Sequence, residues 1–163
     1  MGCPVTASGN IFSTFTDSQT YGEEIRMEYK FDAEAVKQRI IGKRVTRVDH
    51  RGDLILDDGT NLRLYMSDSD CCARAYGDWV VEPSQLDAII TDLKYDAEFD
   101  IKDDDYYGGS ESTAQITILH NQNPVALADC RADAGNGGYY FSVLSLNIQT
   151  PGLDDLDTEV VWQ

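Results

Sequence analysis

Strict alternation of apolar and charged residues between positions 92 and 102 is the feature that most limits what this chain can fold into. Leu93, Tyr95, Ala97, Phe99 and Ile101 occupy the odd positions, and charged residues occupy every even position. A period of two matches the alternation of side chains along a β-strand and does not match the 3.6-residue period of a helix. The pattern therefore predicts a strand with one face in the core and a charged face in solvent.

Similar short segments, bounded by turn residues, recur along the chain. Asp58-Gly59 separates alternating segments at 53–57 and 61–66, which is a strong signal for a β-hairpin. Further strands are predicted at 114–120, 125–129 and 139–148, with turns at 121–124 and 135–138. One clear helix is predicted over 33–41, with Asp32 as its N-cap and Gly42 at its end. The predicted fold class is α+β, mainly β: an antiparallel sheet, rolled or sandwiched, with one or two short helices.

The 163 residues are enough for one domain core, and they show no internal repeat or interdomain linker. Residues 1–20 hold a single charged side chain and many Ser, Thr and Gly residues, so we expect a flexible N-terminal arm. Residues 21–150 are expected to form a single β-rich domain. Residues 151–163 carry four acids and no base, so we expect an acidic C-terminal tail unless Val160, Val161 and Trp162 dock onto the domain.

The charge distribution limits the possible partners. The formal net charge is −16, and residues 92–111 contain eight acids against two lysines. Nucleic-acid binding relies on neutralisation of phosphates by Lys and Arg, so direct nucleic-acid binding is not expected. A basic protein partner fits this surface better, and the candidate binding residues for it are Asp96, Glu98, Asp100, Asp103, Asp104 and Asp105. Solubility alone and cation binding by these carboxylates are the alternative interpretations.

A second candidate cluster surrounds two adjacent cysteines and consists of Asp68, Asp70, Cys71, Cys72, Tyr76, Asp78 and Trp79. Either cysteine, paired with His120 and a carboxylate, would be a candidate nucleophile. Adjacent cysteines are poorly spaced for a mutual disulfide or for tetrahedral zinc, so neither a metal nor a cofactor is expected here. The simpler interpretation is a helical turn capped by Asp68 or Asp70, with one thiol facing the core.

Several functional classes lack their sequence signatures. No apolar run approaches the roughly 18 residues that a membrane-spanning helix needs, and the N-terminus does not have the pattern of a secretory signal. Phosphate-binding, dinucleotide-binding, nucleophile-elbow and metalloprotease motifs are also missing from the sequence. We therefore expect a cytoplasmic protein that is not secreted and has no membrane partner, and we favour a binding protein over an enzyme.

Three segments together resemble a known family. They are residues 57–65, residues 67–78 with Asp70-Cys71-Cys72 and Tyr76-Gly77-Asp78, and residues 86–92. They are similar to a family of small uncharacterised domains encoded by actinobacteria and their bacteriophages, and the resemblance covers residues 41–148. It implies an origin in a bacterial or phage genome and a cytoplasm that keeps the cysteines reduced, but no assigned activity.

Three functions are compatible with these observations. We favour a non-enzymatic acidic binding protein, such as a phage accessory factor that binds or modulates a basic host protein. The alternatives are a structural or assembly component of a virion, and an enzyme that uses Cys71 or Cys72 with His120.

Overall fold

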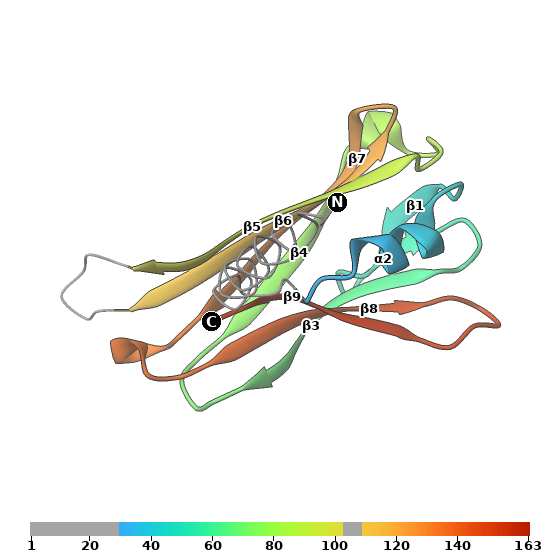
Figure 1. Ribbon diagram of the computed structural model, residues 1–163. Helices are drawn as coiled ribbons and strands as arrows, with labels where there is room; N and C mark the ends of the chain where they lie inside the picture. Colours follow the sequence, from blue (N-terminus) through green and yellow to red (C-terminus); the bar gives the residue numbers. More distant parts are fainter. Residues whose placement is uncertain (1–29, 103–108) are drawn as a thin grey trace, which may run out of the picture.

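The computed structural model describes residues 30–102 and 109–163, which form two antiparallel sheets packed on each other (Figure 1). One sheet has the order β1 (Val45–Val48), β2 (Leu54–Leu56), β3 (Asn61–Ser69), β8 (Ser142–Gln149) and β9 (Leu156–Trp162). The other has the order β4 (Ala75–Val81), β7 (Asn123–Asp133), β6 (Ser110–His120) and β5 (Asp92–Lys102). One helix, α2 (Ala33–Ile40), and two 3-10 turns, η1 (Pro83–Gln85) and η2 (Asn136–Gly138), complete the described elements. The prediction of a mainly β, α+β fold is confirmed.

The core lies between the two sheets. Ile116 and Ile118 of β6, together with Leu144 and Leu146 of β8, are among its fully buried side chains. Burial of each such side chain contributes roughly 1.5–3 kcal/mol to folding. The inward face of β7 carries mainly alanines, which leave room for these larger side chains.

Helix α2 closes one side of the sandwich, next to the edge strands β5 and β9 (Figure 1). It begins as predicted, because an Asp32 carboxylate oxygen accepts a hydrogen bond from the backbone N–H of Ala35 at 2.9 Å. Lys37 forms an ion pair with Asp92 of β5 at 2.9 Å, and the backbone N–H of Asp32 donates to the Thr158 hydroxyl of β9 at 2.9 Å. The helix therefore joins the two sheets where their edges meet.

Strand β5 follows the predicted alternation only as far as Phe99. Leu93 is buried, Tyr95, Ala97 and Phe99 are half-buried, and Phe99 packs against Trp162. A bulge between Glu98 and Ile101 then shifts the register, and Asp100 adopts a φ of 55°. Ile101 pairs with Glu111 and is 42% exposed, so its predicted place on the apolar face is wrong. The extra residue in the bulge moves it to the outer face.

The hairpin at Asp58-Gly59 forms as predicted, between β2 and β3. Strands β4 and β9 were not assigned by the sequence analysis, and they complete the sheets. Residues 75–81 form β4, and residues 156–162 form β9, which pairs with β8 along its length. Val160 and Val161 are buried in the core, so this part of the expected acidic tail belongs to the sandwich. The apolar contribution of these two side chains outweighs the acidity around them.

Candidate functional site

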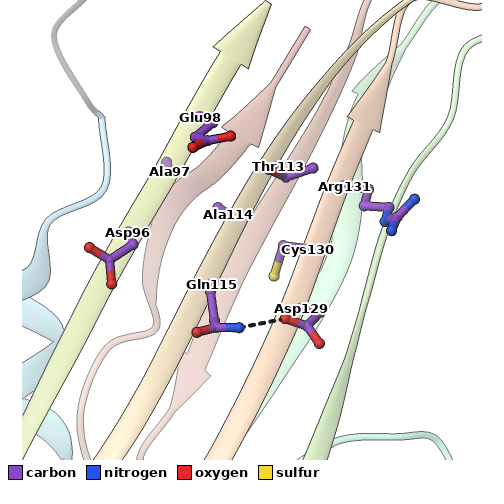
Figure 2. Close-up of a pocket in the computed structure, with 9 residues that line it drawn as sticks. All are labelled: Asp96, Ala97, Glu98, Thr113, Ala114, Gln115, Asp129, Cys130 and Arg131. Carbon is purple, nitrogen blue, oxygen red and sulfur yellow. Dashed lines mark hydrogen bonds between the residues drawn. The ribbon is translucent and has the colours of Figure 1, made fainter. Parts of the chain in front are cut away.

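Three neighbouring strands of the four-stranded sheet form an open hollow of about 630 Å³ on its outer surface (Figure 2). Each strand contributes three consecutive residues: 96–98 from β5, 113–115 from β6 and 129–131 from β7. Side chains alternate across a strand, so the first and third residue of each triplet point outwards and the middle residue points towards the core. The burial of Ala114 and Cys130 agrees with this arrangement.

The register of the four strands places the outward side chains in rows. One row runs Asp96, Gln115, Asp129, Asp78, and the next runs Glu98, Thr113, Arg131, Tyr76. We call these two rows the acidic sheet face. Neighbouring strands are about 4.8 Å apart, so Asp96 and Asp129, two strands apart, lie about 10 Å from each other at the backbone.

Negative charge dominates the acidic sheet face. Asp96, Glu98, Asp129 and Asp78 are all exposed, and Arg131 is the one base within its two rows. Arg131 forms an ion pair with Glu111 at 3.2 Å, so part of its charge is already compensated within the sheet. Gln115 donates a side-chain hydrogen bond to the Asp129 carboxylate at 2.8 Å, which orients that carboxylate (Figure 2). Lys94 belongs to the next row along β5, beyond these carboxylates.

The acidic sheet face combines residues from both predicted clusters. Asp96 and Glu98 come from the predicted acidic site, whereas Tyr76 and Asp78 come from the predicted cysteine cluster. Asp129 and Arg131 were missed by the sequence analysis. The alternation of residues 125–132 places both on the face opposite the alanines. Asp129 was already the last residue of the predicted strand, and Arg131 would have been found had that strand been extended past 129.

The other members of the predicted acidic site lie elsewhere. Asp100 is the bulge residue, and its backbone N–H donates to the Ser112 hydroxyl at 3.1 Å. Asp103, Asp104 and Asp105 lie outside the described residues.

The predicted cysteine cluster separates into three parts. Tyr76 and Asp78 point out of β4, whereas Trp79 is 5% exposed and belongs to the core. Asp68 lies near the end of β3, and Asp70, Cys71 and Cys72 form the turn between β3 and β4.

The expected helical turn with an inward-facing thiol is wrong. Cys71 and Cys72 are both exposed, and their sulfur atoms lie 3.1 Å apart. Ala73 donates to the Asp70 carbonyl across them, and Cys72 has a φ of 77°. The chain reverses here in a β-turn because it passes from one sheet to the other.

The structure does not bring either of these cysteines near His120. That histidine is the last residue of β6, and its Nδ1 lies 2.7 Å from the Ile89 carbonyl oxygen. Cys72 instead packs against Gly135. The residue before it, Ala134, donates its backbone N–H to the Ser110 carbonyl at the opposite end of β6. An eleven-residue strand separates the two ends by about 30 Å, so the predicted cysteine–histidine pair does not form.

The exposed thiol of Cys72 and the buried thiol of Cys130 differ in the cause of their raised pKa. The pKa of Cys72 is raised, first because its thiol shares a hydrogen bond with Cys71 and then because a charge on Cys71 would repel a second one. Burial, with smaller contributions from Asp129 and Asp78, raises the pKa of Cys130 to about 12, so this buried thiol is unreactive at neutral pH.

The described ranges, 30–102 and 109–163, contain no group of three His, Cys, Asp or Glu side chains arranged to hold a metal ion. Within the same ranges, no helix has the length and apolar character that crossing a bilayer requires.

Comparisons with known proteins add a family but no activity. No curated protein and no solved structure matches the chain. The model of a family described as a domain of unknown function matches residues 38–146, from within α2 to within β8. This match covers two thirds of the chain and contains both the acidic sheet face and the cysteine turn. The chain therefore belongs to the DUF7448 family.

Proposed function

We propose that this protein is a non-enzymatic acidic binding protein whose acidic sheet face holds a basic segment of a protein partner. The observation that carries the proposal is the hollow itself. Around it, the acids Asp78, Asp96, Glu98 and Asp129 accompany one base, Arg131. One row further out, Glu111 pairs with Arg131 on one side, and Lys94 lies on the other. Complementary charge would attract a basic partner and set its orientation.

The spacing of the carboxylates suits basic side chains. Rows of carboxylates about 5–10 Å apart match the spacing of Lys and Arg side chains along an extended or helical segment. A carboxylate that faces an Arg side chain accepts two parallel hydrogen bonds, so the electrostatic attraction is accompanied by a defined orientation of the partner.

The edge strand β4 adds apolar contact to this charged surface. Tyr76 is 53% exposed and lies directly opposite Arg131, and Val80 is 65% exposed further along the strand. Tyrosines of this kind are common anchors in protein interfaces. A basic segment with an apolar residue beside it is therefore the ligand that we propose.

The resemblance to domains of actinobacteria and their phages supports a more specific setting. We infer a phage accessory protein that acts in the cytoplasm of its bacterial host, with a basic host protein as its partner. The repulsion between carboxylates and phosphates argues against a nucleic acid as the ligand of this face.

The test compares two variants with the same net charge. The first carries Asp96→Asn, Glu98→Gln and Asp129→Asn on the acidic sheet face. The control carries Asp87→Asn, Asp154→Asn and Asp155→Asn, three exposed residues of the loops between β4 and β5 and between β8 and β9. Each variant changes the formal net charge from −16 to −13, because three acids are neutralised.

Proteins recovered on the 163-residue chain from an actinobacterial lysate are purified, and their affinity for it is then measured by calorimetry at several salt concentrations. We expect the acidic-face variant to weaken binding about tenfold or more and the control variant to change it little. The affinity should also fall steeply with salt, since exposed charges are screened over about 8–10 Å at physiological ionic strength. Equal losses in the two variants, or binding that salt does not weaken, would refute the proposed site.

A further inference from the structure

The turn between β3 and β4 holds two thiols in contact. Cys71 and Cys72 are its central residues, between the Asp70 carbonyl and the Ala73 N–H that close it. Their sulfur atoms are 3.1 Å apart, and both side chains are exposed. Each sulfur is therefore within reach of the other and open to a molecule from solvent.

The backbone of the turn places a cysteine where glycine is the usual residue. Of the two central residues, only Cys72 has a left-handed φ, at 77°. This combination is typical of a type II turn, which normally carries Gly or Asn at its third position. A side chain held in such a conformation costs folding free energy, and an unfavourable conformation of this kind is a reason to look for a function of the side chain.

Neighbouring segments hold this turn in place. The Asp70 N–H donates to the Phe141 carbonyl at 2.8 Å. Gly135 lies so close to the turn that a Cβ at that position would be 2.9 Å from the Cys72 carbonyl oxygen. The loop between β7 and β8 thus packs directly on the backbone of Cys72, while both cysteines remain exposed.

We propose that Cys71 and Cys72 form a redox-active dithiol that reduces a disulfide substrate and closes into a vicinal disulfide. This activity lies outside the acidic sheet face and does not depend on the proposed binding function. It also differs from the cysteine–histidine mechanism, because each cysteine's partner is its neighbour in the sequence.

The reaction has two exchange steps. The Cys71 thiolate attacks one sulfur of the substrate R–S–S–R, forms a mixed disulfide and releases the first RS⁻, which takes a proton from solvent. Cys72 then loses its proton and attacks the Cys71 sulfur, which forms the Cys71–Cys72 bond and releases the second RS⁻. Two protein thiols are oxidised, and the substrate disulfide is reduced to two RSH.

The raised pKa of Cys72 supports this order of events. The hydrogen bond that its thiol shares with Cys71, and the repulsion between two neighbouring thiolates, favour the protonated form of Cys72. Cys71 is therefore the attacking residue, and Cys72 resolves the intermediate.

The ring that closes has eight members. Consecutive Cα atoms are about 3.8 Å apart, which is shorter than the roughly 4.4–6.8 Å usual across a disulfide. Such a bond is strained and easily reduced, so the ring closes when the substrate disulfide is in excess over free thiols, and the dithiol is the resting form in a reducing compartment.

The charges near the turn select the substrate. Asp68 and Asp70 precede the cysteines, Arg74 follows them, and all three are exposed, so the net charge beside the turn is negative and favours a cationic disulfide over an anionic one. We expect reaction rates in the order cystamine, then bis(2-hydroxyethyl) disulfide, then oxidised glutathione.

The experiment follows the tryptic peptide of residues 64–74, which contains Cys71 and Cys72 and no other cysteine. The reduced 163-residue chain is incubated with an excess of bis(2-hydroxyethyl) disulfide, the remaining thiols are blocked with N-ethylmaleimide, and the mass of the peptide is measured by mass spectrometry. The peptide should lose the mass of two hydrogen atoms and carry no maleimide. Cys71→Ser and Cys72→Ser, checked for folding by circular dichroism, should instead keep a mercaptoethanol adduct on the remaining cysteine.

Two further variants separate this proposal from the others. Cys130→Ala and the triple variant of the acidic sheet face should both react like the natural chain. The proposal is overturned if the natural chain accumulates stable adducts as the single variants do, remains fully alkylated, or joins either residue to Cys3. The reverse order of rates for the three disulfides would overturn the assigned substrate charge.

Discussion

Cys72 carries a conformational cost that a glycine would not. A non-glycine residue in the left-handed region costs about 1–2 kcal/mol of folding free energy. A glycine avoids this cost, but its greater freedom in the unfolded chain offsets about 0.4–1 kcal/mol of the gain. We expect Cys72→Gly to stabilise the protein by about 0.5–1 kcal/mol in urea unfolding under reducing conditions. Cys71→Gly, at a position without a positive φ, should be neutral or destabilising. A gain from both variants, or from neither, would contradict this account of the turn.

Cys130 makes stability depend on pH in the alkaline range. Burial raises its pKa to about 12 from the ordinary thiol value of 9.0, so the unfolded chain loses this proton at a lower pH than the folded chain does. Above about pH 9 unfolding therefore releases a proton, and the free energy of unfolding falls by up to about 1.4 kcal/mol per pH unit as the pH rises towards 12.

Comparison with Cys130→Ala isolates this effect, since all other titrating groups are shared. The variant is expected to be less stable than the natural chain at pH 7, because it leaves a cavity in the core. The difference between the two should shrink from pH 9 to pH 11 in urea unfolding. Parallel curves over that range would show that Cys130 does not titrate differently on unfolding.

At the scale of the elements, Thr158 of β9 secures the start of helix α2. Its hydroxyl accepts from the Asp32 N–H at 2.9 Å and donates to the Lys30 carbonyl at 3.0 Å. Thr158→Val keeps the shape of the side chain and removes both bonds, which should cost about 1–3 kcal/mol. Thr158→Ser, which retains the hydroxyl, is the matched control.

Hydrogen exchange locates the effect of this substitution. We expect the amides of α2 to exchange faster in Thr158→Val, with those of β6 and β7 unchanged or accelerated only in proportion to the loss of global stability. Uniform acceleration across both sheets would mean that the helix and the sheets unfold as one unit.

At the scale of the whole molecule, a net charge of −16 repels itself in the folded state. Salt screens this repulsion, so we expect Tm to rise from low to physiological ionic strength in sodium chloride. The two triple variants, each with three fewer charges, should start from a higher Tm at low salt and respond less. A Tm that falls with sodium chloride would show that the ion pairs, such as Lys37 with Asp92, contribute more than the repulsion.

The sequence alone determined the features that depend on neighbours along the chain. The Asp32 cap and Gly42 define α2, Asp58-Gly59 defines a hairpin, and the alternation from 93 to 99 defines the inner face of β5. Local backbone preferences and side-chain periodicity are sufficient for each of them.

Only the tertiary structure decided what lies side by side. Strands β4 and β5 follow one another in the chain but occupy opposite edges of a sheet, and β7 and β6 between them bring Asp129 and Arg131 into the acidic sheet face. The bulge at Asp100, the inclusion of β9 and the contact between the two sulfur atoms were likewise outside local prediction. Strand order, register shifts and the geometry of a turn between sheets depend on how the whole core packs, and no short segment of sequence encodes that packing.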